Sequence, residues 1–325
     1  MTTTKPRVLV LADTENWAWG RKARAYAQHL SADWSIDVQY QVQGVTWPAA
    51  GGYDLVHCFE FPQAGHVPPE HRARGGKIVV GLTANVWRTW GRDKVRAWAA
   101  PADGIHANSR LVLEDLQAHV FTEPGDPPLW YCPNGVDAEF WRRTESHPDH
   151  LIAAHVGKPN LRKGAPLIID ACRHVGVTLK LVQRTAKLAL PAETMRAFYQ
   201  GVSLQVTASN MDATPNPMLE GAACGNALLS TPVGNMVEFI THLENGVHLP
   251  PLLGPAAAAP EYSVTQMRAD NPRLLAALTD WLAWMRDHYD VVRAMGAAAR
   301  RTVEQAWTWP HQVRHVDAMW KAVIG

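Results

Sequence analysis

Two carboxylates, Asp212 and Glu220, are separated by seven residues in the segment DATPNPMLEGAACGNALLSTPVGN (residues 212–235). Pro215 and Pro217 lie between them, so the part of the segment that holds Asp212 cannot be a regular helix. Glu220 falls in the first or second turn after Pro217, near the positive end of an expected helix, where a carboxylate is stabilised. An acid at the start of a helix is also common for structural reasons, so the spacing alone assigns no function.

A cationic loop, GKPNLRKG (residues 157–164), follows an expected strand and precedes an expected helix. It begins with Gly157 and contains Lys158, Arg162 and Lys163. Cations in a loop that ends at a helix N-terminus suit a phosphate group, because the side chains offset its charge while free backbone N–H groups point at it. The same loop is equally compatible with a solvated basic turn.

The composition predicts an ordinary globular protein of two domains. A chain of 325 residues, 47% hydrophobic and 19% charged, exceeds the usual size of a single core. Its net charge of +1 gives no global attraction to nucleic acid or anionic membranes, and no apolar run is long enough to span a bilayer. The start, MTTTKPRVLVLAD, lacks a signal-peptide pattern, so a cytoplasmic location is expected. Four cysteines without a C-x-x-C pair predict reduced, buried thiols.

Strand and helix patterns alternate twice along the chain. The expected strands are residues 7–13, 37–42, 54–60, 77–85, 104–109 and 129–135 in the first half and 151–157, 178–183, 202–209, 226–232 and 246–250 in the second. Three final helices are expected at 271–289, 290–307 and 310–324, with a break at Pro310. This order predicts two doubly wound parallel α/β sheets, which bind ligands at the carboxyl ends of their strands. The expected domains are 1–140 and 141–310, with a helix at 311–325 that packs back on the first domain.

Several motifs keep one order along the chain. The cationic loop matches the pattern G-R, four residues, K-G, except that Lys158 stands where the pattern has Arg. The two acids match the pattern Glu, seven residues, Glu, except that Asp212 stands where the pattern has the first Glu. Residues 231–249, which alone predict only a turn and a short helix, hold a V-G-G-x-x-E run with Asn235 in place of the second glycine, and the connector YCPNGVDAEFW holds a P-N-G-V-D motif. Together these motifs resemble the retaining glycosyltransferases of family 4.

That family has the GT-B fold, so the resemblance implies two Rossmann-like domains that face each other across a cleft. The second domain would bind a nucleoside-diphosphate sugar, for which a UDP-sugar is expected. The reaction implied is transfer of a hexosyl or pentosyl group to an acceptor hydroxyl, with retention and with no cofactor, by a monomer or homodimer. No Asp-x-Asp pattern occurs, so no metal site is expected.

The resemblance also implies a role for each residue that matches a motif. Lys158 and Lys163 would neutralise the diphosphate as its bond to the sugar breaks, and Asp212 would accept hydrogen bonds from the transferred sugar, which makes these three the catalytic candidates. Glu220 would accept hydrogen bonds from the ribose, and the backbone N–H groups of residues 216–219 would support sugar and phosphate. The other residues implied at the sugar-donor site are Gly157, Arg162, Asn216, Pro217, Met218, Leu219 and Gly234.

The first domain resembles the family least and is expected to hold the acceptor. Two segments place tryptophan beside cations on expected loops: DTENWAWGRKAR, with Trp17, Trp19 and Arg21, and NVWRTWGRDKVRAW, with Trp87 and Arg88. Aromatic faces with cations suit a sugar ring, and also the stacked bases of a nucleic acid. The same tryptophans are equally well explained as packing anchors at helix starts.

No general base is assigned. Family members often have a histidine after the fourth strand, where this chain has Asn85 at the end of GLTAN. His57 lies at the end of an expected strand and is a candidate for the cleft, although a lone histidine beside an apolar strand is more often structural.

Three functions remain open on this basis. The first is a glycosyltransferase that acts on a small molecule, a glycan or a glycoconjugate. The second is a glycosyltransferase that acts on a modified base in DNA, which requires base extrusion. The third is a catalytically inactive protein that binds sugar nucleotides.

Overall fold

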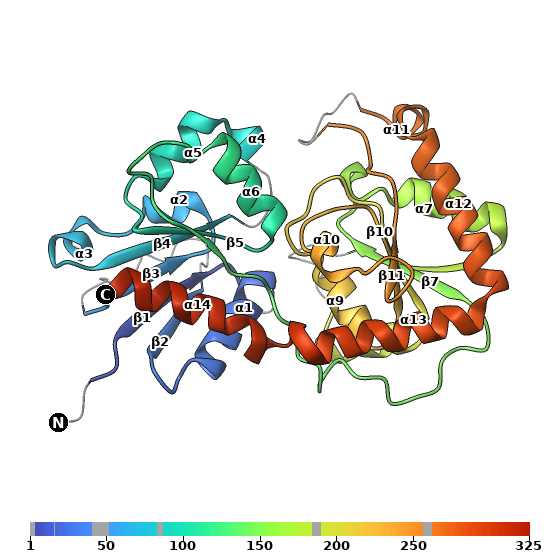
Figure 1. Cartoon of the computed structure of the whole chain (residues 1–325), viewed down its shortest axis with the longest axis horizontal. Coiled ribbons are helices and arrows are strands. Elements are labelled where there is room, and N and C mark those ends of the chain that lie inside the picture. The colour runs from blue at the N-terminus through green and yellow to red at the C-terminus, as the bar shows by residue number, and fades with distance from the viewer. Residues whose placement is uncertain (1–3, 16, 41–51, 83–86, 184–189, 256–261) are drawn as a thin grey trace. The chain divides into compact units, whose positions relative to one another are not determined.

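The computed structural model describes residues 4–15, 17–40, 52–82, 87–183, 190–255 and 262–325. The chain forms two compact units (Figure 1): unit 1 is Met1–Gly135 with Trp309–Gly325, and unit 2 is Val136–Thr308. The chain crosses between them a few residues before the expected boundaries at 140/141 and 310/311. The reason at the first crossing is that Val136, Ala138 and Trp141 are buried in a core cluster of unit 2.

Unit 1 holds a six-stranded parallel sheet in the order β2-β1-β3-β4-β5-β6. Its strands are β1 (Arg7–Ala12), β2 (Ser35–Tyr40), β3 (Leu55–Cys58), β4 (Lys77–Leu82), β5 (Gly104–Ala107) and β6 (Leu129–Tyr131). Its helices are α1 (Ala18–His29), α2 (Phe61–Ala64), α3 (Pro69–Ala73), α4 (Trp87–Trp90), α5 (Arg92–Ala99), α6 (Arg110–His119) and α14 (Trp309–Ile324). Tyr26 of α1 and Trp320 of α14 belong to one buried cluster with Val8, Val10 and Leu55 of the sheet, so the last helix completes the core that the first strand begins.

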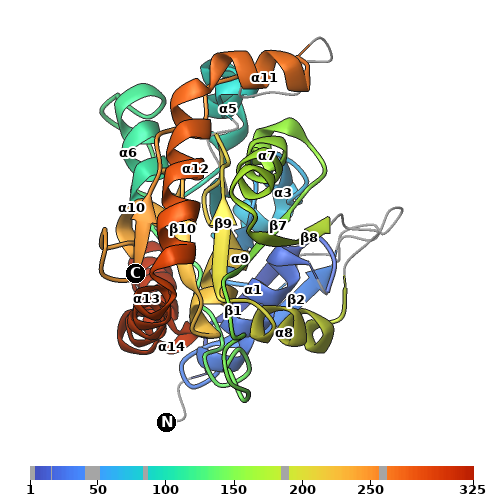
Figure 2. The ribbon, with the colours of Figure 1, turned by 90° about the vertical axis from the view of Figure 1, so that its right-hand side faces the viewer.

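Unit 2 holds a five-stranded parallel sheet in the order β11-β10-β9-β7-β8. Its strands are β7 (Ile152–Gly157), β8 (Thr178–Gln183), β9 (Leu204–Thr207), β10 (Ala227–Ser230) and β11 (Gly246–His248). Its helical elements are the 3-10 turn η1 (Leu161–Lys163), α7 (Ala165–Val175), α8 (Ala192–Gln200), α9 (Asn216–Ala223), α10 (Met236–Phe239), α11 (Val264–Asp270), α12 (Pro272–Asp287), α13 (Tyr289–Thr302) and the short π-helix η2 (Val303–Trp307). Figure 2 shows β10, β9, β7 and β8 side by side in the order of the sheet.

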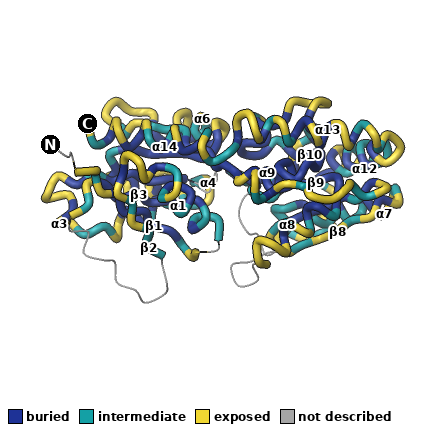
Figure 3. The backbone as a smooth tube through the Cα atoms, turned by 90° about the horizontal axis from the view of Figure 1, so that it is seen from below, coloured by how far each residue is buried: buried dark blue, intermediate teal, exposed yellow. Residues whose placement is uncertain are grey.

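Helices cover both faces of the unit 2 sheet. Leu167 of α7 and Leu278 of α12 share one buried cluster with the strands, and Tyr199 of α8 and Met218 of α9 share another with η2. The inner strands are therefore almost wholly buried, whereas the edge strand β8 contains only exposed and partly buried residues. In Figure 3 the buried stretches of the tube accordingly run through the inner strands.

The structure confirms the layout expected from the sequence. Each of the eleven expected strands is present, and all pair in parallel. The helix expected at 290–307 is α13 followed by η2, and the break falls at Thr308, whose ψ of 160° is extended. Pro310 lies in the first turn of α14, where its missing N–H costs no hydrogen bond.

The composition also led to expectations about the cysteines and about membrane-spanning segments. All four cysteines are free and buried, as expected of reduced thiols. No helix in the described part of the chain has both the length and the apolar character needed to cross a bilayer.

Candidate functional site

The order of strands in unit 2 reverses at β7. The chain runs from β7 to β8 on one side and then returns to β9, β10 and β11 on the other. Parallel sheets of this kind bind ligands outside the carboxyl ends of the strands at the point of reversal. The cationic loop follows β7 and the loop that holds Asp212 follows β9, so both lie at this point.

The loops after β7 and β9 are in direct backbone contact. Gly164 has a φ of +64°, and a Cβ atom on it would lie 2.4 Å from the carbonyl oxygen of Ala208. Any side chain there would push the loops apart and would also strain the backbone. The Asn210 N–H donates to the carbonyl of Arg162 over 3.0 Å, which ties the two loops a second time.

This contact brings Lys163 and Asp212 together as an ion pair between the Lys163 Nζ and the Asp212 Oδ2. Their side chains are 15% and 21% exposed, so water screens the attraction only in part. Beside them the Arg162 Nη1 lies 3.5 Å from the sulfur of Met211. A cation and an acid are therefore in direct contact at the carboxyl edge of the sheet.

The loop after β10 packs on the loop after β9. Gly234 has a φ of +49°, and a Cβ on it would lie 2.1 Å from the carbonyl oxygen of Ala213. The Asn235 N–H donates to the same carbonyl over 2.9 Å, and the Thr231 hydroxyl donates to the carbonyl of Ser209 over 2.6 Å. Residues from three motifs that are far apart in the sequence are thus joined at one edge of the sheet.

A buried histidine, His155, lies beneath this edge and carried no signal in the sequence beyond one polar residue in an apolar strand. Its Nδ1 lies 3.0 Å from the Val206 carbonyl, which can only accept, so the Nδ1 carries the proton and the Nε2 is an acceptor. Burial, with the Lys163 ammonium nearby, lowers the pKa of His155 to about 4. The Nε2 would lie 2.9 Å from a Cβ on Gly157, so glycine at that position leaves room for the neutral ring.

Glu220 lies in the second turn of α9, within the range expected from Pro217. It is 3% exposed, and its Oε2 accepts a hydrogen bond of 2.8 Å from the hydroxyl of Tyr199 on α8. Tyr199 is fully buried and was not singled out from the sequence. The carboxylate is therefore held between two helices rather than in solvent.

Two backbone N–H groups at the start of α9, where the resemblance implies support for sugar and phosphate, donate to carbonyls of the preceding loop. The Asn216 N–H donates to the carbonyl of Thr214 over 2.9 Å, the Met218 N–H donates to the carbonyl of Pro215 over 2.8 Å, and Pro217 has no N–H. The side chains of Met218 and Leu219 are buried in a core cluster. Lys158, by contrast, is exposed, and the structure records no hydrogen bond or ion pair of its ammonium with another described residue.

The tryptophan and cation segments of unit 1 are used in packing. The Trp87 Nε1 donates to the Asp115 Oδ2 over 2.6 Å, Arg88 forms an ion pair with the same carboxylate, and its guanidinium lies 4.6 Å from the centre of the Trp87 ring. Both residues lie on the short helix α4 rather than on a loop. These contacts attach α4 to α6.

The residues at the start of α1 are partly buried. Trp17 is the N-cap residue of α1, and Trp19 and Arg21 lie in its first turn. The Trp19 ring lies 6.1 Å from that of Phe59. Asn85, the remaining acceptor-side candidate, lies outside the described residues.

The hypothesis that His57 reaches a cleft is not supported. Its side chain has no exposed surface, its Nδ1 accepts a hydrogen bond of 3.1 Å from the Trp320 Nε1, and its ring centre lies 4.5 Å from that of His106. Burial, with His106 and Lys22 nearby, holds the pKa of His57 well below its usual range. A neutral core histidine explains all of these contacts.

Lys22 of α1 is a second feature that the sequence did not reveal. It is 1% exposed, and its ammonium donates to the Asn108 Oδ1 over 2.7 Å and to the Cys132 carbonyl over 3.1 Å. No carboxylate in the described part of the chain forms an ion pair with it. Burial lowers the pKa of Lys22 to about 7.

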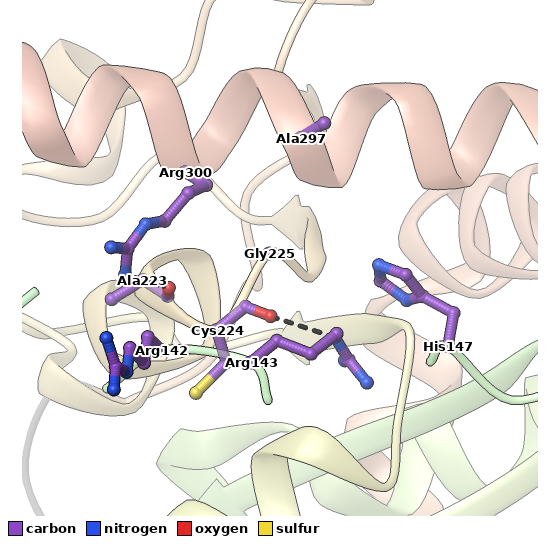
Figure 4. Close-up of a pocket in the computed structure, with 8 residues that line it drawn as sticks. All are labelled: Arg142, Arg143, His147, Ala223, Cys224, Gly225, Ala297 and Arg300. Atoms are coloured by element: carbon purple, nitrogen blue, oxygen red, sulfur yellow. Dashed lines mark hydrogen bonds between the residues drawn. The ribbon is translucent and has the colours of Figure 1, made fainter. Parts of the chain in front are cut away.

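A cavity of about 290 Å³ lies in unit 2 beside the carboxyl end of α9 (Figure 4). Its lining residues are Arg142, Arg143, His147, Ala223, Cys224, Gly225, Ala297 and Arg300. Arg143 donates to the carbonyl of Cys224 over 3.1 Å and to that of Val202 over 2.6 Å, and Arg300 donates to that of Ala223 over 2.6 Å. These arginines satisfy carbonyl groups at helix ends and loops, so a structural role accounts for them.

In the described residues no group of His, Cys, Asp and Glu has the arrangement of a metal site. No family model and no curated protein sequence matches the chain.

The two parallel-sheet units define the class of the protein: the chain has the GT-B fold. A solved structure of sucrose-phosphate synthase from Thermosynechococcus elongatus matches it with a TM-score of 0.75 at 12% identity, over 98% of this chain and 99% of that one. HepE from Anabaena, solved in complex with UDP-glucose, matches with a TM-score of 0.69 at 12% identity, over 97% and 99%. A glycosyltransferase from Rickettsia africae matches with a TM-score of 0.67 at 12% identity, over 99% of both chains. At this identity the likeness establishes the fold alone.

Proposed function

We propose that this protein is a glycosyltransferase that transfers a sugar from a nucleoside-diphosphate sugar to an acceptor hydroxyl. The observation that carries the proposal is the joining of Lys163 and Asp212 at the point where the strand order of unit 2 reverses. A cation there suits a diphosphate, and an acid beside it suits the hydroxyls of the sugar attached to that diphosphate.

Each charged residue at this site has its own role in the proposed reaction. Lys163, with the exposed Lys158, offsets the negative charge that develops on the diphosphate as the bond to the sugar breaks, and cations fixed in advance for such a charge are a large catalytic term. Asp212 accepts hydrogen bonds from the transferred sugar. Glu220 accepts hydrogen bonds from the ribose, as a carboxylate commonly does at the edge of a doubly wound sheet.

A UDP-sugar is the donor that we propose. The motif order of the retaining glycosyltransferases of family 4 supports it, and HepE, which has a similar fold, has been solved in complex with UDP and with UDP-glucose. Transfer with retention and without a metal is part of the same proposal. The acceptor is a small molecule, a glycan or a glycoconjugate.

The direct test is to incubate the protein with UDP-, GDP-, ADP- and TDP-sugars and to measure release of the nucleoside diphosphate. We expect slow hydrolysis of a UDP-sugar that is unchanged by a chelator, faster turnover with an acceptor, and a product whose anomeric configuration by NMR matches the donor. Tight nucleotide binding without hydrolysis or transfer from any donor would show an inactive binding protein instead. Retention on DNA that falls steeply with salt would favour action on a modified base.

A further inference from the structure

The hydrogen bond between Tyr199 and Glu220 links two helices of unit 2 at the proposed ribose anchor. The Tyr199 hydroxyl donates to the Glu220 Oε2 over 2.8 Å. Both side chains are at least 97% buried, since Tyr199 is 0% and Glu220 3% exposed. A hydrogen bond to a charged group away from water is stronger than one in solvent, and removing its donor leaves a buried carboxylate less satisfied.

Tyr199 is itself held in one place. Its carbonyl accepts from the Asn226 Nδ2 over 3.0 Å and from the Arg143 Nη2 over 3.3 Å. Its ring centre lies 5.5 Å from that of Trp141 in an edge-to-face arrangement, which fixes the ring as well. The hydroxyl is therefore a fixed point rather than a mobile partner.

A fixed donor determines the direction of the carboxylate. The Tyr199 hydroxyl fixes the position of Oε2, and the two oxygens of an ionised carboxylate together offer about four lone-pair sites. A ribose offers two adjacent hydroxyls that donate well to a carboxylate whose orientation is already set, because no rotation has to be frozen on binding.

We propose that Tyr199 is a positioning residue, which orients the Glu220 carboxylate so that it distinguishes ribose from deoxyribose in the bound nucleotide. The proposal rests on the proposed function, since it takes Glu220 as the ribose anchor. Tyr199 itself touches the carboxylate and not the nucleotide. It follows that the choice of sugar in the nucleotide depends on a residue of α8, outside the three loops.

A purely structural bond would also stabilise the fold, so the test needs a matched control. Tyr289 lies in the same unit and donates through its hydroxyl to the Pro148 carbonyl over 2.6 Å and lies 3.2 Å from the Ser203 Oγ. Tyr289→Phe removes the hydroxyl of a partly buried tyrosine, as Tyr199→Phe does for a fully buried one, but it leaves the bond to Glu220 intact. Both variants should lose stability, and only one should change ribose selectivity.

The experiment is to measure Kd for UDP and for 2′-deoxy-UDP by calorimetry with wild type, Tyr199→Phe, Tyr289→Phe and Glu220→Gln. We expect wild type to prefer UDP by about tenfold, Tyr199→Phe and Glu220→Gln to prefer it by about two- to threefold or less, and Tyr289→Phe to match wild type. If folded Tyr199→Phe has the same ratio of the Kd for 2′-deoxy-UDP to the Kd for UDP as wild type, the proposal is overturned while the proposed function stays intact. Absence of nucleoside-diphosphate binding in wild type would overturn both.

If Tyr199→Phe does not fold, a structure of the wild-type protein with UDP decides the question. We expect Glu220 to accept from a ribose hydroxyl while it still accepts from Tyr199. A Glu220 side chain that leaves Tyr199 when the ribose binds would overturn the proposal.

Discussion

Two lysines of this chain are withdrawn from bulk water in different ways. Lys163, 15% exposed, forms an ion pair with an acid in a loop at the carboxyl edge of the unit 2 sheet. Lys22, 1% exposed, lies inside unit 1, and its hydrogen-bond acceptors among the described residues are the neutral oxygens of Asn108 and Cys132. A cation that keeps an acidic partner near solvent is suited to exchange that partner for an anionic ligand. A cation enclosed by neutral acceptors has no such access, and its lower pKa reflects the cost of burial.

The largest effect that this comparison predicts is on catalysis. Lys163→Ala should lower the rate of transfer by about 10²- to 10³-fold, because it removes a cation aimed at the developing charge of the diphosphate. Unfolding temperature should change little, since the ion pair is partly exposed. The measurement is the initial rate of nucleoside-diphosphate release. Lys22→Met is the matched control and should keep a rate close to wild type, whereas a wild-type rate in Lys163→Ala would contradict the site.

The second prediction concerns pH and distinguishes Lys22 from Lys163. The pKa of Lys22 is about 7 in the folded protein and 10.5 in an unperturbed chain, so between these values the unfolded state binds more protons. The free energy of unfolding should therefore rise with pH above about 7, by at most about 1.4 kcal/mol per pH unit from this group. Buried cysteines, whose pKa is raised from 9, oppose the rise at higher pH.

The measurement is denaturant unfolding of wild type and Lys22→Met between about pH 7 and pH 8.5. Wild type should gain stability relative to Lys22→Met across this range. Equal slopes of the free energy of unfolding against pH in the two proteins would show that Lys22 keeps its proton in the folded protein. Burial would then not distinguish the protonation of Lys22 from that of Lys163.

The layout was predictable from the sequence because it rests on local signals. Apolar runs between glycine, proline and polar clusters predicted every strand, and Pro310 predicted the helix break. The three loops were also found from the sequence, because their glycines and charges follow strands directly. The specific contacts were not predictable, because they join distant residues. The partners of Lys22 lie 86 and 110 residues away, and Tyr199 lies 21 residues before Glu220.

The candidate residues of unit 1 show the same limit. His57 has the sequence context of a strand end, but Trp320, 263 residues later, supplies its hydrogen bond and covers it. For Trp87 and Arg88 the sequence left a ligand site and a packing anchor equally open, and the contacts with Asp115 of α6 favour packing. A sequence shows which side chains can do chemistry, whereas only the packing shows which of them are already occupied.

The third prediction tests whether Asp212 acts as the internal counter-ion of Lys163. Asp212→Asn should abolish most transfer but should tighten binding of UDP about two- to fivefold. The reason is that the Lys163 ammonium would no longer have to give up an acidic partner before it binds the diphosphate. Asp212→Glu, which keeps the charge, should bind UDP about as wild type does. Calorimetry with UDP checks both. Weaker binding of UDP by Asp212→Asn would show that Asp212 contacts the nucleotide rather than competing with it.

The smallest predicted effect tests the assignment of the unit 1 tryptophans to packing. Trp87→Phe should lower the free energy of unfolding by about 1 kcal/mol, because it removes the hydrogen bond from the indole to Asp115. Trp90→Phe should cost less, because the structure records a ring contact with Trp98 for this residue and no indole hydrogen bond within the described residues. Rates of transfer should stay within about twofold of wild type in both, since neither ring is assigned to a substrate. A large loss of transfer in Trp87→Phe with unchanged stability would return this tryptophan to the acceptor side, because a packing anchor cannot be lost without a cost in stability.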